Sequence, residues 1–327
     1  MSSPPFVTLP ERVHRCDIDT SRGAFAALEA RSPVDPRSDG HASRRPALLA
    51  PGYTGSKEDF IAVLRPLADA GYRVVALDLR GQYETPGPDD REAYSMAALA
   101  ADVAAVIDSL GSPVHLLGHS LGGLVGREAA LAKRDALAKR DALAKRDALA
   151  KRDALAKRDA LASLTLLDSG PAGIGGPRAE QSRLLASALA EYDQETVWQG
   201  MEALKAGDPA AARRTPEVVE FEHRRFVGNA VAGLLGMGDT LRTAPDKTDA
   251  LAAVDLPVLV AYGEADETWP PEQQAAMAER LGARTEVFTG AGHSPAAEAP
   301  GATVRAVLRF WRSVEVGAPR LSADPDW

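Results

Sequence analysis

The chain has 327 residues, of which 45% are hydrophobic, so it is long enough to bury a substantial core. Its net charge of −8 at pH 7 argues against a nucleic-acid partner, because surfaces that bind nucleic acids are basic. Cys16 is the only cysteine, which excludes a disulfide framework and a cysteine-based metal site.

Short apolar runs alternate with helical patterns, which predicts an α/β fold with a mostly parallel sheet and helices on both faces. Residues 12–18 and 23–30 are expected to form an antiparallel hairpin at one edge of this sheet. The remaining strands are mostly continuous apolar runs, as burial on both faces requires. They are expected at 47–50, 73–78, 113–118, 163–168, 257–262 and 285–289.

Helical patterns fill the segments between these strands. The first helix is expected at 56–71, where a capping pattern from Ser56 to Asp59 marks its start and Gly71 its end. The second places apolar residues on one stripe, at the spacing of an amphipathic helix. This second helix and two further ones are expected at 95–111, 271–282 and 303–314.

Residues 170–250 differ from the rest, because they contain helical patterns and no convincing strand. We therefore expect a core formed by residues 1–169 and 251–327, interrupted by a helical cap at 170–250 and ending in a frayed tail. The cap contains apolar side chains that either line a pocket or pack within it, namely Trp198, Phe221, Phe226 and Met237.

The sequence "GHSLGG", which begins at Gly118, follows an expected strand and opens an expected helix. It matches the pattern G-x-S-x-G, a sharp turn that exposes a serine at the end of a strand. The context of strand, turn and helix makes Ser120 the predicted nucleophile.

A serine hydroxyl needs a base, and the base needs a carboxylate that orients it. His293, in the loop "GAGHSP", is the predicted base. Asp266 follows the preceding strand and is the preferred acid, while Asp168, one strand earlier, remains the alternative. All of these residues follow the carboxyl ends of expected strands, where sites in such sheets lie.

An acyl-transfer site also requires two backbone N–H groups that bind the oxyanion. Leu121, directly after the predicted nucleophile, is expected to supply one of them. The loop "APGYTGS" is expected to supply the other from Tyr53.

With these pieces in place, the chain resembles the α/β-hydrolase-fold serine hydrolases over nearly its full length. The matching segments are "PGYTGS", "DLRG", "GHSLGG", "YGEADETWP" and "GAGHSP". Most relatives carry His-Gly where this chain has Pro51 and Gly52. The resemblance implies a catalytic triad with no metal and no cofactor, and it covers esterases, lactonases, peptidases and carbon–carbon bond hydrolases.

Residues 131–160 consist of five identical copies of "LAKRDA". With one copy left, the helix after the serine would have an ordinary length, so the repeat is interpreted as an expansion of one turn. Its composition favours helix, but successive leucines step round the axis by about 120°, so no apolar stripe forms. The expanded segment is expected to loop out, to fold as a helical hairpin, or to exchange part of the sheet with a second copy.

These observations predict a serine hydrolase that cleaves a small carboxylic ester or lactone through an acyl-enzyme. Peptidase or carbon–carbon bond hydrolase activity is the alternative within the same fold, and a non-catalytic protein assembled through the repeat is the alternative from another class. The chain shows neither a signal-peptide pattern nor an apolar run of membrane-spanning length. We therefore expect a cytoplasmic enzyme with a small-molecule substrate, no membrane or nucleic-acid partner, and a homo-oligomer only through the repeat.

Overall fold

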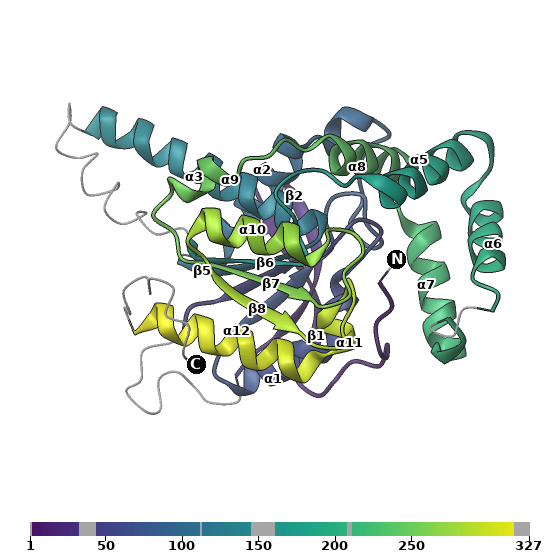
Figure 1. The fold of residues 1–327 in the computed structure, drawn as a ribbon, viewed down its shortest axis with the longest axis horizontal. Coiled ribbons are helices and arrows are strands. Elements are labelled where there is room, and N and C mark those ends of the chain that lie inside the picture. Colours follow the sequence, from purple (N-terminus) through teal and green to yellow (C-terminus); the bar gives the residue numbers. More distant parts are fainter. Residues whose placement is uncertain (1, 33–43, 112, 145–160, 208–210, 317–327) are drawn as a thin grey trace.

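The computed structural model describes residues 2–32, 44–111, 113–144, 161–207 and 211–316, and it contains an eight-stranded sheet between helices (Figure 1). The strands follow the order β1-β2-β4-β3-β5-β6-β7-β8. β1 and β2 form the antiparallel edge hairpin, β2 also pairs antiparallel with β4, and the other pairs are parallel. The strands span Val13–Thr20, Gly23–Ala30, Ala47–Ala50, Val74–Leu77, Val114–His119, Leu161–Leu167, Val258–Gly263 and Arg284–Phe288 in chain order.

The predicted fold class is confirmed, and each expected strand is present within two residues of its expected bounds. β3, β4, β5 and β7 are buried at every residue, which explains why their sequences are continuous apolar runs. β8 instead alternates between buried and more exposed residues, because it lies at the other edge of the sheet.

Helices cover both faces of the sheet (Figure 1). One apolar cluster joins α2 (Met96–Leu110), α3 (Leu121–Ala144) and α10 (Pro271–Leu281) to one face. A second cluster joins α1 (Ile61–Asp69) and α12 (Pro300–Glu315) to the opposite face. The expected helices are therefore present, and their apolar stripes face the sheet.

Ser56 directly precedes the first helical residue, as expected, but the hydrogen bond of the expected cap is absent. Ser56 Oγ makes no capping hydrogen bond, and the segment Lys57–Phe60 is a short 3-10 helix that leads into α1. The Asp59 carboxylate lies 2.7 Å from Arg225 Nη1 instead. Both side chains are buried, and a buried carboxylate requires a partner, which Arg225 supplies.

The first part of the repeat continues α3, which extends through Ala144. Residues 131–136 of this helix are half-buried or exposed, in contrast to the buried residues before them. The expected loop, hairpin or exchange depends on residues 145–160, which lie outside the described residues. The tail expected at 317–327 lies outside them as well.

The segment 170–250 connects β6 to β7 through helices, and we call it the cap segment. Residues 216–243 form two helices rather than one, because Asn229 ends the first helix and donates to the carbonyls of Arg225 and Phe226. The helices of the cap segment are α5 (Gly176–Glu191), α6 (Gln194–Leu204), α7 (Pro216–Gly228), α8 (Val231–Thr243) and α9 (Thr248–Ala252).

A buried arginine of α3 holds both ends of the cap segment. Arg127 donates from Nη1 to the carbonyl of Pro171 and from Nη2 to that of Pro245, the latter at 3.0 Å. Since α3 begins at the predicted nucleophile, the same helix positions both the serine and the cap segment.

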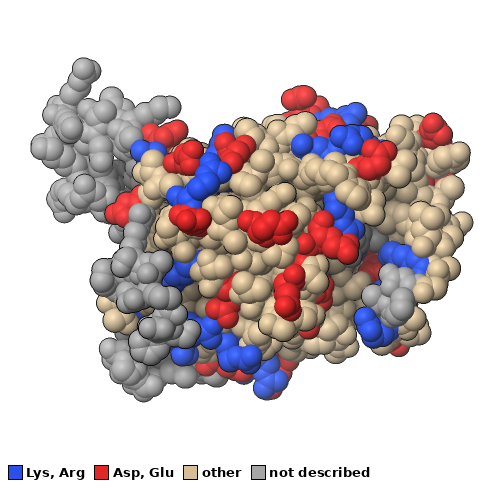
Figure 2. Space-filling view, in the orientation of Figure 1, with Lys and Arg blue, Asp and Glu red and all other residues tan. Residues whose placement is uncertain are grey.

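Among the described residues, no helix has the length and apolar composition needed to cross a membrane. Figure 2 shows Lys and Arg interspersed with Asp and Glu over the face in view. This face therefore carries no continuous basic surface of the kind that binds nucleic acid.

Candidate active site

Ser120 lies on a sharp turn between β5 and α3. Its φ of 53° falls in the left-handed region, which costs energy for a residue with a side chain. The neighbouring glycines permit this turn: a Cβ at Gly118 would lie 2.2 Å from Gly122 O, and a Cβ at Gly122 would lie 2.3 Å from Ala50 O. The elbow geometry expected from "GHSLGG" is therefore present.

His293 and Asp266 form a hydrogen-bonded pair, with 2.9 Å between His293 Nδ1 and Asp266 Oδ1. Because a carboxylate only accepts, Nδ1 carries the hydrogen of this bond. Asp266 Oδ1 also accepts from Thr268 N, and Asp266 Oδ2 accepts from Gln274 Nε2, each at 2.8 Å. Burial alone would raise the pKa of Asp266, but the hydrogen bond and charge of His293 outweigh it and lower that pKa.

Ser120 and His293 are not hydrogen-bonded to each other within the part of the chain that the structure describes. A second histidine links the elbow to the His293 loop, because His119 Nε2 donates to the backbone carbonyl of His293 at 2.6 Å. Burial and the neighbouring His293 lower the pKa of His119 to about 3, so its ring is neutral. Bonds between a nucleophile and its base are often loose until substrate binds.

Asp168, the alternative acid, is not the hydrogen-bond partner of His293 Nδ1, which is bonded to Asp266 Oδ1. It is fully buried and its Oδ1 accepts from Gly263 N at 2.9 Å, while its Oδ2 meets no N–H or hydroxyl donor. Burial, the charge of Asp266 and a hydrogen bond between the two carboxyl groups raise the pKa of Asp168 well above its ordinary value. A raised pKa favours the protonated form of Asp168, and the carboxylate that is hydrogen-bonded to His293 Nδ1 is Asp266.

Ligand atoms of Asp168, Asp266 and His293 lie within 4.8 Å of one another, a spacing that a metal ion also requires. The donors around them do not fit such a site. Thr268 N, Gln274 Nε2 and His293 Nδ1 all direct hydrogens at the Asp266 oxygens, which occupies the lone pairs that would bind a cation. The arrangement is that of an oriented imidazole.

Two backbone N–H groups beside Ser120 have no acceptor among the described residues, and they belong to Tyr53 and Leu121. Leu121 is the first residue of α3, where a helix leaves its N–H groups unpaired. Gly52, directly before Tyr53, approaches so closely that a Cβ on it would lie 3.0 Å from Ser120 Cβ. The two residues predicted to form an oxyanion site therefore flank the serine with unused donors.

The chain has the sequence features of a known protein family. The pattern of the alpha/beta hydrolase family matches residues 47–307. The chain belongs to this family.

Individual hydrolases of known name or structure resemble this family member over most of its length. The proline iminopeptidase of Lactobacillus delbrueckii subsp. lactis is 28% identical over 263 residues, which cover 77% of this chain and 85% of that protein. The structure of a thermophilic esterase from Thermogutta terrifontis superposes with a TM-score of 0.63 and 26% identity, and covers 92% of this chain and 99% of the esterase. A shorter match to the RutD protein of Variovorax paradoxus is 41% identical over 93 residues, and spans only 35% of that relative.

Several residues of this site were not identified from the sequence. Gln274 holds Asp266 from one turn inside α10, and Glu298 accepts from the backbone N–H groups of Gly292 and Ser294 on either side of His293. A glutamate five residues after the histidine is a signal that could have indicated the second contact. Gln274 carries no such signal, because glutamine is common on helices and its partner is distant in the sequence.

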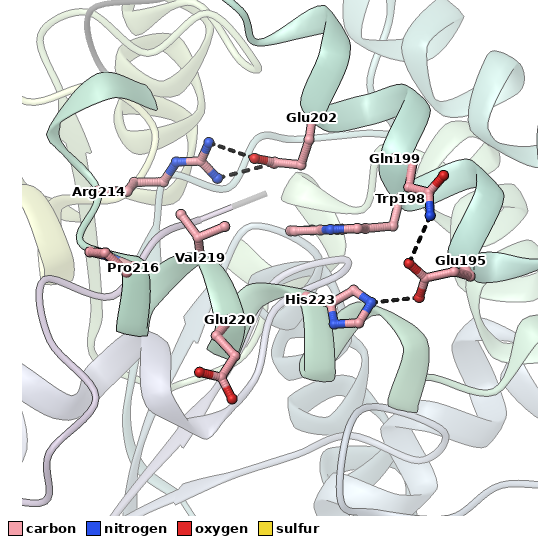
Figure 3. Close-up of a pocket in the computed structure, with 9 residues that line it drawn as sticks. All are labelled: Glu195, Trp198, Gln199, Glu202, Arg214, Pro216, Val219, Glu220 and His223. Carbon is pink, nitrogen blue, oxygen red and sulfur yellow. Dashed lines mark hydrogen bonds and ion pairs between the residues drawn. The ribbon is translucent and has the colours of Figure 1, made fainter.

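A groove of about 720 Å³ lies between α6 and α7, and none of the predicted site residues lines it. Its polar side chains pair among themselves: Arg214 binds Glu202, and Glu195 accepts from His223 and Gln199 (Figure 3). Trp198 is 6% exposed there and packs with Phe226, which favours the expectation that these aromatic residues pack within the cap segment. Because its polar groups are already paired, the groove offers no group poised for chemistry.

Proposed function

We propose that this family member is a serine hydrolase that cleaves a small carboxylic ester or lactone through an acyl-enzyme. The observation that carries the proposal is a serine held in a strained turn between two unused N–H donors, Tyr53 and Leu121. A strained serine beside free donors is the arrangement that acyl transfer requires.

In the proposed reaction, Ser120 Oγ attacks the carbonyl carbon of the substrate while His293 Nε2 takes the hydroxyl proton. Asp266 stabilises the imidazolium that forms, through the bond to Nδ1. The N–H groups of Tyr53 and Leu121 bind the oxyanion of the tetrahedral intermediate. His293 then protonates the leaving alcohol oxygen, and water attacks the acyl-enzyme by the same sequence of proton transfers.

The surroundings of the serine support a small acyl group. The Tyr53 side chain is half-buried, and its hydroxyl donates to the Leu234 carbonyl of α8 at 2.8 Å. The Trp269 ring lies 6.0 Å from that of His293. We infer that these two aromatic side chains limit the space for an acyl group near the serine. Ester hydrolysis is also supported by the likeness to the thermophilic esterase.

Peptide hydrolysis is the second candidate, and the similarity to a proline iminopeptidase over 77% of the chain favours it. The two functions differ in the leaving group, because an amide nitrogen must be protonated before it departs. Release of p-nitrophenol from short p-nitrophenyl esters and of naphthylamine from L-proline β-naphthylamide would separate them.

The proposed function is tested by intact-mass measurement after exposure to a fluorophosphonate, beside Ser120→Ala. One adduct on the parent and none on Ser120→Ala, together with a loss of ester hydrolysis of at least about a thousandfold, is expected. A folded parent that takes no adduct, or a Ser120→Ala variant with parental activity, would overturn the proposal.

A further inference from the structure

Gln82 is a fully buried glutamine in the loop after β4, outside the triad and outside the oxyanion loop. Its side-chain amide connects the loop after β4 to the loop after β3. Nε2 donates to Gly52 O at 2.8 Å, and Oε1 accepts from Leu79 N at 3.0 Å. A backbone carbonyl only accepts and a backbone N–H only donates, so these two partners fix the orientation of the amide.

Gly52 O is also the acceptor of a tight turn, because Gly55 N donates to it at 3.1 Å. Thr54, the third residue of this turn, has a φ of 58°, a conformation that turns of this kind normally assign to glycine. A strained turn needs further contacts to hold it, and Gln82 supplies one.

The carbonyl of Gly52 and the N–H of Tyr53 belong to the same peptide bond. In a planar trans peptide these two groups point in opposite directions. A donor that holds Gly52 O on one side therefore directs Tyr53 N–H to the other side. Tyr53 N–H has no acceptor among the described residues, and Gly52 lies against Ser120.

We propose that Gln82 is a positioning residue for the oxyanion site: by holding Gly52 O, it fixes the peptide that directs Tyr53 N–H at the substrate. This inference rests on the proposed function, because it assigns Gln82 to the oxyanion donor of that reaction. The bond to Gly52 O leaves the Ser120, His293 and Asp266 side chains untouched. Its loss therefore affects the transition state, where the oxyanion carries its charge, more than the binding of the substrate.

The test compares the parent with Gln82→Met, which keeps the side-chain length and removes the donor. Removal of a whole oxyanion donor costs about 10²–10³ in kcat, and here the Gly55 N–H still holds Gly52 O. We expect kcat for a short p-nitrophenyl ester to fall about 10- to 100-fold, with KM within about threefold of the parent. A short alkyl trifluoromethyl ketone forms an adduct with the serine that places an oxyanion in this site. Its inhibition constant should rise by the same factor by which kcat falls.

Thr85→Val is the matched control, because Thr85 lies in the same loop and its hydroxyl is equally buried. That hydroxyl accepts from Ala26 N and donates to Asp78 O, so the variant loses buried hydrogen bonds without affecting Gly52. Its kcat should remain within about threefold of the parent even if its melting temperature falls. Gln82→Asn, which keeps an amide but is too short to reach both partners, should lower kcat at least tenfold and serves if Gln82→Met does not fold.

A folded Gln82→Met or Gln82→Asn variant with parental kcat would overturn the inference and leave the proposed function intact. So would a loss confined to KM, or an equal loss in Thr85→Val. A parent that neither hydrolyses esters nor takes the fluorophosphonate would overturn the proposed function and this inference together.

Discussion

The two ends of the sheet differ in how tightly the chain is constrained. Five non-glycine residues among those described have a left-handed φ, and four of them follow β3, β4, β5 and β6 at the carboxyl ends: Thr54, Tyr83, Ser120 and Asp168. At the opposite end, α3 extends away from the sheet into the repeat (Figure 1). The side chains of residues 131–136 there are half-buried or exposed. Backbone strain is thus concentrated where the proposed chemistry lies.

The difference arises from what surrounds each end. A strained residue costs about 1–3 kcal/mol and persists only where neighbouring contacts determine its conformation. At the carboxyl ends such contacts are dense: buried hydrogen bonds, close glycine contacts and a coupled pair of carboxyl groups. A solvated helix offers few contacts, so additional turns there cost little. Substitutions at the carboxyl ends of the strands should therefore lower activity or stability strongly, whereas changes in the repeat should have small effects.

The largest expected effect distinguishes the two acids at the carboxyl ends. Asp266→Asn removes the charge that stabilises the His293 imidazolium, so kcat for a short ester should fall by about a thousandfold or more. Asp168→Asn leaves the hydrogen bond between Asp266 and His293 in place, and kcat should change by less than about tenfold. Steady-state kinetics of both variants would measure this. The reverse order of effects would make Asp168 the triad acid.

Close packing at the elbow is tested by Gly122→Ala. The new Cβ would lie 2.3 Å from Ala50 O, a backbone atom of a buried strand, so the free energy of unfolding should fall by about 3 kcal/mol. Gly200→Ala in α6 is the control, since a Cβ there has nothing within 4 Å, and the change should stabilise the protein by up to about 1 kcal/mol. Urea denaturation of both variants decides the matter, and equal effects would show that the elbow is not tightly packed.

The buried acid pair predicts a pH dependence of stability. The ordinary pKa of Asp168 is 3.8, and its pKa in the folded protein is raised well above this. The folded chain therefore keeps a proton that the unfolded chain releases, so this stabilisation is complete below pH 3.8 and is lost as the pH rises towards the folded pKa.

Asp168→Asn has no proton to lose at this position. The free energy of unfolding of the parent, relative to this variant, should fall by up to about 1.4 kcal/mol per pH unit above about pH 4. Urea titrations of both proteins at pH 4.5, 6 and 7.5 would measure the difference. A difference that does not vary with pH would mean that Asp168 is ionised throughout.

The smallest effect is expected at the opposite end of the sheet. Deletion of four of the five "LAKRDA" copies should change kcat/KM by less than about tenfold, or about 1.4 kcal/mol. The reason is that α3 runs away from Ser120, so the repeat leaves the sheet far from the serine. A larger change would show that the repeat contacts the site and that the two ends of the sheet are coupled.

Much of the fold could be predicted because its signals are local. The continuous apolar runs of β3 to β7 indicate buried strands, and "GHSLGG" between a strand and a helix indicates the elbow. The hydrogen bond expected in the cap at Ser56 is absent because Asp59 pairs with Arg225 instead. Arg225 is 166 positions away in the chain. A local pattern cannot include such a distant partner, which a buried carboxylate requires.

By itself, the sequence determined the class of the fold, the order of its strands along the chain and the predicted nucleophile, base and acids, since these follow from periodicity and from short motifs. Only the tertiary structure decided which of two aspartates meets His293, and that Gln82 holds the peptide before Tyr53 N–H. These outcomes depend on distances between loops that follow different strands. Such distances are determined by how the strands pair and twist in the sheet, and no neighbouring residues in the chain encode them.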